Sequence, residues 1–265
     1  MELGALPEIT GGQISKINSL TVVLPVFNEE SVIEESVLAL VRNLQAICTD
    51  YEIVVVDDGS TDATAQILER LVMRVAGLRL FHNATNRGLG GALQRGFAEA
   101  GKPLVFYTDA DMPFQYSEIL VAAQKMEASG ADMVAGFRVN RELESPVRRA
   151  CSMAYNGCVR LIYGVQLRDI NCAFKLVRLN VLRKIELKAG GSFIDAEMVV
   201  KASYCGFRIE EFGVEYHPRQ EGDSRLFRFY PIMNAFFEMA KLYPDILRIK
   251  RIEKKPEKSF DRSVH

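Results

Sequence analysis

The chain has 265 residues, 48% of them hydrophobic and 25% charged, a balance that predicts a folded domain with a sizeable core rather than a disordered chain. A formal net charge of −1 gives no overall attraction for nucleic acid, so we expect no nucleic-acid partner. Five cysteines without a C-x-x-C pair, and three scattered histidines, support neither a disulfide framework nor a zinc site and favour a reducing compartment. Neither a signal-peptide pattern nor an apolar run of about 18 residues occurs, so secretion and membrane spanning are not expected.

Apolar runs and stretches of helical periodicity alternate along the chain after a mixed lead-in at residues 1–19. The apolar runs fall at 20–26, 52–57, 78–83, 104–107 and 133–137, and the helical stretches between them at 31–45, 63–75, 88–100 and 117–130. Strands that are apolar throughout and alternate with helices predict a sheet that is parallel, buried on both faces and connected by right-handed crossovers. We therefore expect an α/β fold with a mostly parallel central sheet.

Acidic and amide side chains follow three of these predicted strands. They are Asn28, Glu29 and Glu30 after the first, Asp57, Asp58 and Asp62 after the second, and Asp109 and Asp111 after the fourth. In parallel sheets a ligand binds beyond the carboxyl ends of the strands. Two carboxylates as close as Asp109 and Asp111 repel each other unless a cation or a polyol lies between them, so we expect a binding site here. The alternative for each motif is a solvated turn that caps a helix.

Four segments, in this order, resemble the nucleotide-sugar half of an inverting family 2 glycosyltransferase of GT-A fold. They are VVLPVFNEE (22–30), EIVVVDDGSTDAT (52–64), NRGLGGALQRGF (86–97) and YTDADMPF (107–114). The resemblance covers about residues 20–226 and implies a Rossmann-like sandwich that binds a nucleoside diphosphate sugar. It implies that the donor is bound by Pro25, Phe27, Glu29, Asp57, Asp58, Asn86, Gly88 and Asp109. Asp109 and Asp111 would flank the diphosphate and hold Mg²⁺ or Mn²⁺, with Asp111 as a catalytic residue.

One position departs from the family pattern. Relatives commonly read D-x-D-x-Q, whereas Pro113 stands where that glutamine would be, and Gln115 follows two residues later. Proline offers no side-chain ligand. Either Gln115 or water replaces the missing ligand, or metal affinity is reduced, or the protein binds a nucleotide sugar without turnover.

The second half of the chain resembles the polyprenyl-phosphate branch of the family, the dolichol-phosphate mannosyltransferase type. The resemblance rests on an R-x-x-R segment at 138–141, an Asp-x-x-x-Ala-Phe-Lys segment at 169–175 and an Arg-x-x-Gly-x-Ser ending at 219–224. It implies that the acceptor phosphate is bound by Arg138, Arg141, Arg149, Arg219 and Ser224, with Asp169 as a second catalytic residue. A guanidinium group can bind two phosphate oxygens at once through two parallel N–H···O hydrogen bonds. The alternative is a solvated basic helix face paired to Glu142 and Glu144.

The chain changes character after residue 226. Residues 227–255 are rich in aromatic residues and interrupted by charges and prolines, which predicts an amphipathic helical segment at a membrane interface, followed by a tail at 256–265. Residues 248–265 carry seven basic and three acidic residues, a balance that anionic headgroups attract. The alternative is that the aromatic residues pack on the catalytic domain at 20–226. We expect a cytoplasmic protein that is peripheral at the inner face of the membrane.

The sequence thus favours sugar transfer from a nucleoside diphosphate sugar, GDP-mannose or a UDP-hexose, to a polyprenyl or dolichyl phosphate, with inversion and a divalent metal. One alternative keeps the reaction but uses a saccharide acceptor. Another is a non-catalytic nucleotide-sugar binder, which Pro113 motivates. A phosphatase or nucleotidyl transferase is disfavoured, because the acidic pair follows a fourth strand after a complete nucleotide-binding half.

Overall fold

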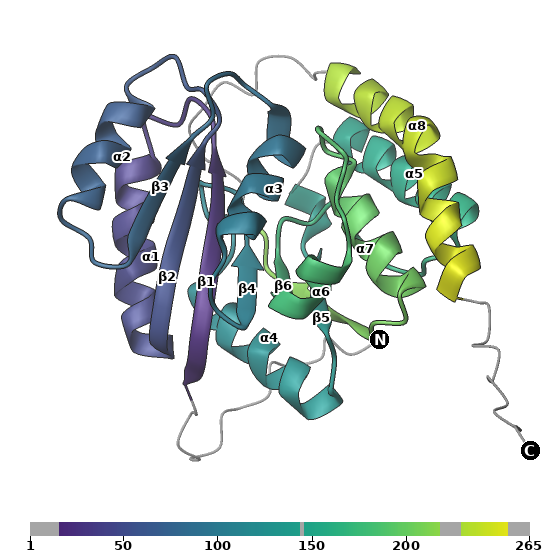
Figure 1. Ribbon diagram of the computed structural model, residues 1–265, viewed down its shortest axis with the longest axis horizontal. Coiled ribbons are helices and arrows are strands. Elements are labelled where there is room, and N and C mark those ends of the chain that lie inside the picture. The colour runs from purple at the N-terminus through teal and green to yellow at the C-terminus, as the bar shows by residue number, and fades with distance from the viewer. Residues whose placement is uncertain (1–15, 144–145, 218–228, 254–265) are drawn as a thin grey trace, which may run out of the picture.

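A central sheet runs through the molecule, and helices cover both of its faces (Figure 1). The computed structural model describes residues 16–143, 146–217 and 229–253. Its strands are β1 (Ile17–Val26), β2 (Cys48–Asp57), β3 (Leu78–His82), β4 (Leu104–Tyr107), β5 (Met133–Arg138), β6 (Lys175–Arg178) and β7 (Ile209–Val214). Its helices are α1 (Ile33–Ile47), α2 (Thr64–Val72), α3 (Gly88–Glu99), α4 (Tyr116–Ser129), α5 (Pro146–Tyr163), α6 (Leu179–Lys184), α7 (Ile194–Tyr204) and α8 (Phe229–Glu253), with a short 3-10 turn at Arg141–Leu143.

The strand order across the sheet is β3-β2-β1-β4-β6-β5-β7. β6 is antiparallel to both of its neighbours, β4 and β5, and the other neighbouring pairs are parallel. The predicted α/β fold with a mostly parallel sheet is confirmed, and the first strand begins at Ile17, three residues before the predicted start. Residues 1–15 of the expected lead-in lie outside the described part of the chain.

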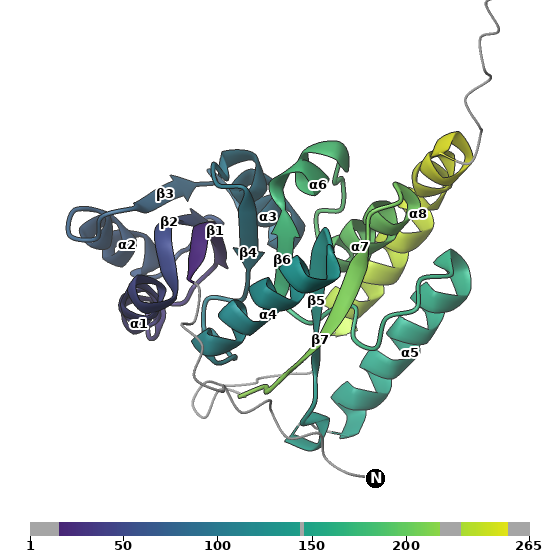
Figure 2. The same cartoon turned by 90° about the horizontal axis from the view of Figure 1, so that it is seen from below.

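The sheet separates two hydrophobic cores. Val22 and Leu24 of β1 pack into the core beneath α1, α2 and α4, whereas Val23 between them packs into the core beneath α3, α5, α6, α7 and α8. Figure 2 shows these two sets of helices on opposite sides of the sheet. Successive side chains of a strand point to opposite faces, so a strand buried on both faces needs the continuous apolar run that the sequence shows.

Helix α8 lies beside α5 at the outer edge of the second core (Figures 1 and 2). The rings of Tyr155 and Phe236 are 5.8 Å apart, and Tyr163 donates a hydrogen bond to the Met239 carbonyl at 3.0 Å. The inner side of α8 is buried in that core, with Ala235, Met239, Leu242 and Ile246 among the core residues. None of the helices in the described residues has the length and apolar character needed to cross a bilayer.

Helix α3 begins against residues 186–191, which we call the strap. The Gly90 amide donates to the Gly190 carbonyl at 2.8 Å. A Cβ atom added to Gly90 would lie 2.0 Å from the Ala189 carbonyl oxygen, and one added to Gly88, whose φ is +77°, would lie 2.6 Å from the Gly190 oxygen. The glycines that open α3 therefore admit another stretch of the protein backbone, and the contact of Gly88 with the donor stays a prediction.

We expect Gly90→Ala to lower the free energy of unfolding by about 1–3 kcal/mol, because a backbone oxygen 2.0 Å away can move only with the whole strap. Gly157→Ala, on an exposed position of α5 with no heavy atom within 4 Å of the added Cβ, is the control and should gain up to about 1 kcal/mol. Urea unfolding measures both. Equal stability of Gly90→Ala and the wild type would contradict the contact.

Candidate functional site

The candidate site lies at the edge of the sheet where the parallel strands end. β2, β1 and β4 are neighbours and run in the same direction, so the chain leaves all three at this edge (Figure 1). The three acidic and amide motifs that the sequence places after these strands are thereby brought to adjoining positions.

The loop after β1 is joined to the loop after β2 by a series of hydrogen bonds. Asn28 donates its backbone N–H to Ser60 Oγ at 3.0 Å, and Asn28 Oδ1 accepts the Thr61 N–H at 2.8 Å. Glu29 donates its N–H to Thr64 Oγ1 at 2.8 Å. Asn28 has a φ of +55°, a left-handed conformation that asparagine tolerates better than most residues. The first two motifs therefore form one continuous surface.

Asp57 and Asp58 are buried and hold the ends of β2 and β3 together. Asp57 lies 2.9 Å from His82 Nδ1. Asp58 accepts a hydrogen bond from Asn83 Nδ2 at 2.7 Å, and both of its oxygens accept the Arg87 N–H at 3.0 Å. The structure shows both carboxylates as supports of this edge, and their direct contact with a nucleoside stays a prediction.

The other predicted donor residues lie around these supports. Phe27 is 42% exposed, an accessible aromatic face next to the joined loops, and Pro25 and Glu29 are half-buried. Asn86 is exposed, and its Oδ1 accepts the Gly88 N–H at 3.0 Å. The exposed ring and amide are available at the surface of the edge, which is the placement that a role in donor binding requires.

Asp109 and Asp111 follow β4 directly. Asp109 is exposed, whereas Oδ1 of Asp111 is buried and has no hydrogen-bond partner among the described residues. A buried carboxylate oxygen without a donor is costly, and a cation ligand would remove that cost. Met112, which follows, has a φ of +45°, a strained conformation for a long side chain. The pair therefore fits a divalent cation.

The Pro113 loop is bound to the end of β7. The Pro113 carbonyl accepts the His217 N–H at 2.8 Å, and Glu118 accepts the backbone N–H groups of Gln115 at 3.0 Å and Glu215 at 2.8 Å. The Gln115 side-chain amide donates to Glu215 at 3.3 Å. In this arrangement the amide of Gln115 is engaged with Glu215, and its predicted role as a metal ligand stays a prediction.

A buried charged cluster adjoins the acidic pair. Arg138 and Asp169 form a two-point ion pair, with distances of 2.7 Å from Nε and 2.9 Å from Nη2. Burial raises the pKa of Asp169, but the Arg138 hydrogen bonds and charge outweigh it and hold the pKa below its usual range. Lys175 is fully buried and donates a hydrogen bond to the Cys172 carbonyl. Burial lowers the pKa of Lys175, and the negative charges of Asp169 and Asp109 oppose this effect. The cluster links the two predicted halves of the site.

The remaining predicted acceptor residues are less enclosed. Arg141 is half-buried and close enough to Asp169 to lower the pKa of that carboxyl. Arg149 is exposed on the first turns of α5. Arg219 and Ser224 lie outside the described residues. The chain enters their segment from His217, which is hydrogen-bonded to the Pro113 loop.

Comparison with known proteins decides the family. The glycosyl transferase family 2 profile matches residues 21–185, more than half of the chain. The chain belongs to glycosyltransferase family 2. This confirms the predicted family and enzyme class, and the sheet described above has the predicted GT-A architecture.

Curated relatives within family 2 are about 30% identical to this chain. Glycosyltransferase AglD from Haloferax volcanii and the dodecaprenyl-phosphate galacturonate synthase from Rhizobium johnstonii are each 32% identical over 214 residues, 78% of this chain. The chain spans 34% of the first and 61% of the second. The dolichyl-phosphate beta-glucosyltransferase of Saccharomyces cerevisiae is 30% identical over 240 residues, 80% of this chain and 71% of the relative.

Solved structures share the fold at lower identity. Glucosyl-3-phosphoglycerate synthase from Mycobacterium tuberculosis, in a complex with Mn²⁺, UDP and glucosyl-3-phosphoglycerate, matches with a TM-score of 0.58 at 17% identity. The match covers 89% of this chain and 80% of that one. At this identity the likeness establishes the fold alone.

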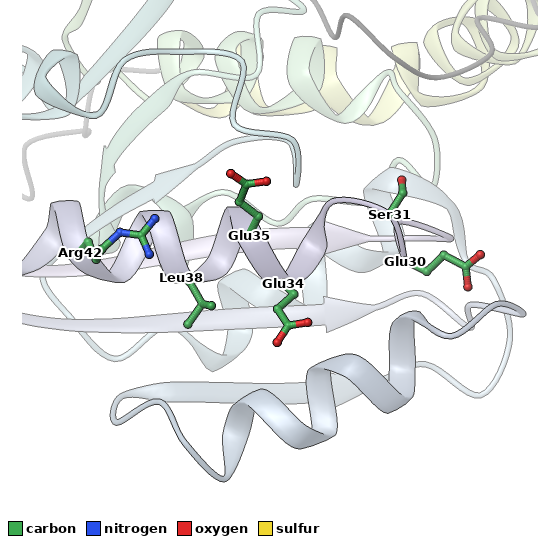
Figure 3. Close-up of a pocket in the computed structure, with 6 residues that line it drawn as sticks. All are labelled: Glu30, Ser31, Glu34, Glu35, Leu38 and Arg42. Atoms are coloured by element: carbon green, nitrogen blue, oxygen red, sulfur yellow. The ribbon is translucent and has the colours of Figure 1, made fainter.

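A pocket of about 480 Å³ lies along α1 and the residues just before it, and Glu30 is the one lining residue that belongs to the motifs after the strands (Figure 3). Its lining residues are Glu30, Ser31, Glu34, Glu35, Leu38 and Arg42. Three of the six are carboxylates, which repel the diphosphate of a nucleotide sugar. This lining does not favour the pocket as a donor site, and the placement of the donor at the strand ends stays a prediction.

Asp195 is a candidate functional residue that the sequence did not single out. It is 4% exposed, and its Oδ1 has no hydrogen-bond partner among the described residues. It lies in the first turn of α7, just after Gly191, whose carbonyl accepts the Ile194 N–H at 3.3 Å. In sequence it resembles any acidic residue that favours a helix N-terminus, so only its burial distinguishes it.

Burial raises the pKa of Asp195 well above 3.8. The folded state therefore binds this proton more tightly than the unfolded state, and stability falls as pH rises from about 4 toward the raised pKa. Asp195→Asn removes that loss. The variant should therefore become more stable relative to the wild type as pH rises: we expect the difference in free energy of unfolding to grow by about 1.4 kcal/mol for each pH unit in this window.

Urea unfolding of both proteins at several pH values between 4.5 and 7.5 measures this difference. Parallel pH profiles would contradict the assignment of Asp195 as a buried carboxyl that is protonated more readily in the folded state.

Proposed function

We propose that this chain transfers a sugar from a nucleoside diphosphate sugar to a polyprenyl phosphate, with inversion at the anomeric carbon. The observation that carries the proposal is the placement of a basic cluster beside the acidic pair, with the buried Lys175 paired in the sheet to Tyr107, two residues before Asp109. A diphosphate donor and a phosphate acceptor must approach each other at one such place. The lipid phosphates named for two relatives support the acceptor class.

In this reaction an oxygen of the acceptor phosphate attacks the anomeric carbon of the donor. The bond from that carbon to the diphosphate breaks, and its electron pair leaves with the diphosphate. A phosphate acceptor is already anionic at neutral pH and needs no strong general base. The joined loops after β1 and β2, with the ring of Phe27, would hold the nucleoside.

The acceptor phosphate would be bound by arginines at the basic cluster. Arg141 and the exposed Arg149 lie at the entrance to α5, and Arg138 is the cation that Asp169 orients through their ion pair. Arg219 and Ser224 complete the proposed set. We therefore assign Asp169 a positioning role, because its two oxygens are occupied by Arg138.

Asp109 and Asp111 would hold Mg²⁺ or Mn²⁺ together with oxygens of the donor diphosphate. Magnesium commonly takes one or two carboxylates and completes its coordination with phosphates and water, which fits two acidic ligands and the unpartnered Asp111 oxygen. When bound, the cation would neutralise the charge that builds on the departing diphosphate. Water, rather than Pro113, would occupy the remaining position.

The proposal is tested by sugar transfer with the full chain, Mn²⁺ and a panel of UDP- and GDP-sugars, offered a polyprenyl phosphate or an oligosaccharide. We expect product on the lipid phosphate. Product on the oligosaccharide alone would favour the saccharide acceptor, and donor binding without any product on prolonged incubation would favour a non-catalytic binder.

Asp111→Asn supplies the matched variant for that assay. The amide preserves the shape of the side chain but removes its charge, so we expect metal-dependent transfer to fall by tenfold or more while the protein stays folded. Metal-dependent transfer at the wild-type rate would contradict the assignment of Asp111.

The proposed membrane surface is formed by α5 and α8. Of the ten exposed large apolar side chains in the described residues, seven lie on these two adjacent helices. They are Val147, Met153, Leu161 and Ile162 on α5, and Met233, Phe237 and Tyr243 on α8. Exposed Arg149, Lys241 and Arg248 accompany them. Apolar side chains with flanking basic residues suit an anionic bilayer, so we propose a peripheral location at the inner, cytoplasmic face.

Phe237→Glu should weaken binding to vesicles that contain anionic lipid by about tenfold or more, because an aromatic side chain can no longer be buried in the interface. Phe237 is 66% exposed, so the change leaves the core intact. Met73→Glu, with Met73 86% exposed at the end of α2, is the control and should bind as the wild type does. Vesicle co-sedimentation measures all three, and equal binding of Phe237→Glu would contradict the role of α8.

A further inference from the structure

The strap is held on its inner side by α7. Glu197 is fully buried and accepts the backbone N–H groups of Lys188, at 2.9 and 3.0 Å, and Ala189, at 2.7 Å. Lys201 pairs with Glu197 at 2.6 Å and donates to the Glu186 carbonyl. These contacts fix the first half of the strap to the core.

The second half of the strap is held by α8. Glu238 Oε1 accepts the Gly190 N–H at 2.8 Å and the Gly191 N–H at 2.9 Å. Neither glycine has a side chain to keep the helix away: a Cβ on Gly191 would lie 2.6 Å from Asn234 Nδ2 and 3.0 Å from Glu238 Oε2. One carboxylate oxygen thus binds two successive amides of the strap.

The opposite side of the strap caps α3. The Gly190 carbonyl accepts the N–H groups of Gly90 at 2.8 Å and Gly91 at 3.3 Å, and the Ala189 carbonyl accepts Gln94 Nε2 at 2.7 Å. The backbone N–H groups of Gly90 and Gly91, at the N-terminus of α3, thus already have hydrogen-bond partners within the protein, so they are not available to a phosphate. The helix end is positioned by the strap.

The first turn of α3 continues directly from the Asn86–Gly88 loop, which is fixed at its other side by the bonds from Arg87 N–H to Asp58. The loop therefore has two supports, the buried Asp58 and the strap. Glu238, about 150 residues away in the chain, controls the second.

We propose that Glu238 is a positioning residue for donor binding: through Gly190 and Gly191 it sets the strap, and through the strap it sets α3 and the Asn86–Gly88 loop. This inference rests on the proposed binding of a nucleoside diphosphate sugar at this edge. It also connects donor affinity to α8, the helix whose outer side carries Met233 and Phe237.

The test is the binding of UDP and of GDP, with Mn²⁺, to the full chain by titration calorimetry. We expect Glu238→Ala to weaken binding of the preferred nucleotide about tenfold, equivalent to about 1.4 kcal/mol. Glu238→Gln should bind within about threefold of the wild type, because the amide oxygen can still accept both strap amides.

Tyr163→Phe is the matched control. It removes the hydrogen bond from Tyr163 to the Met239 carbonyl, so it loosens α8 next to Glu238 without touching the strap, and its nucleotide affinity should equal that of the wild type. If the role of Glu238 is purely structural, Glu238→Ala and Tyr163→Phe should both lose stability and both keep the nucleotide affinity of the wild type. Folded Glu238→Ala with wild-type affinity would overturn the proposal.

Hydrogen exchange on the unmodified chain covers the case in which Glu238→Ala fails to fold. By reciprocal linkage, nucleotide binding should slow amide exchange in the strap and around Glu238. Unchanged exchange there, in a protein that binds nucleotide, would contradict the inference alone. Absence of nucleotide binding by the wild type would instead contradict the proposed function on which it rests.

Discussion

The parallel pairing of β2, β1 and β4 is the constraint on which the rest of the site depends. Its register places Val26 beside Asp57 and Val23 beside Tyr107. The acidic stretch that follows Tyr107 therefore leaves the sheet level with the last residues of β1, next to the loop that carries Phe27. Because these strands are buried on both faces, a slip by one residue would exchange the side chains that pack in the two cores, so packing in both cores fixes the positions of the polar groups at the edge.

The acceptor side of the site depends on the one reversal of direction in this sheet. β6 runs antiparallel to β4, with Lys175 paired to Tyr107, so the segment before β6 arrives at the edge where the parallel strands end. Asp169 and Lys175 are brought beside the acidic pair by this reversal. Buried charges are costly unless they are compensated, and Arg138 compensates Asp169 through two hydrogen bonds. The two anionic substrates that we propose would thus meet the carboxyl ends of parallel strands and the amino end of an antiparallel one.

The sequence predicted the first five strands, the helices between them and the edge at which the site lies, but not β6 and β7 or the use of each residue. Continuous apolar runs and helical periodicity determine strands and helices locally, and these predictions were confirmed. Asp57 and Asp58 were predicted as donor-binding residues, but their hydrogen bonds to the β3 end depend on tertiary packing and gave no signal in the sequence. The close contact between the α3 glycines and the strap likewise depends on tertiary packing. Asp195 and Glu238 gave no local signal, because acidic residues are ordinary in a first helical turn and on an amphipathic helix.

Pro113, which follows the D-x-D segment, lies in a loop that is held by contacts with neighbouring residues. Its carbonyl accepts the His217 N–H, and the next residue, Phe114, packs its ring against Phe174 at 5.5 Å and Tyr216 at 6.1 Å. A residue with a fixed φ and no donor suits a loop whose carbonyl must point at a neighbouring strand end. The loop is therefore shaped by contacts to β7 and the core, so coordination of a cation would fall to Asp109, Asp111 and the oxygens of the donor.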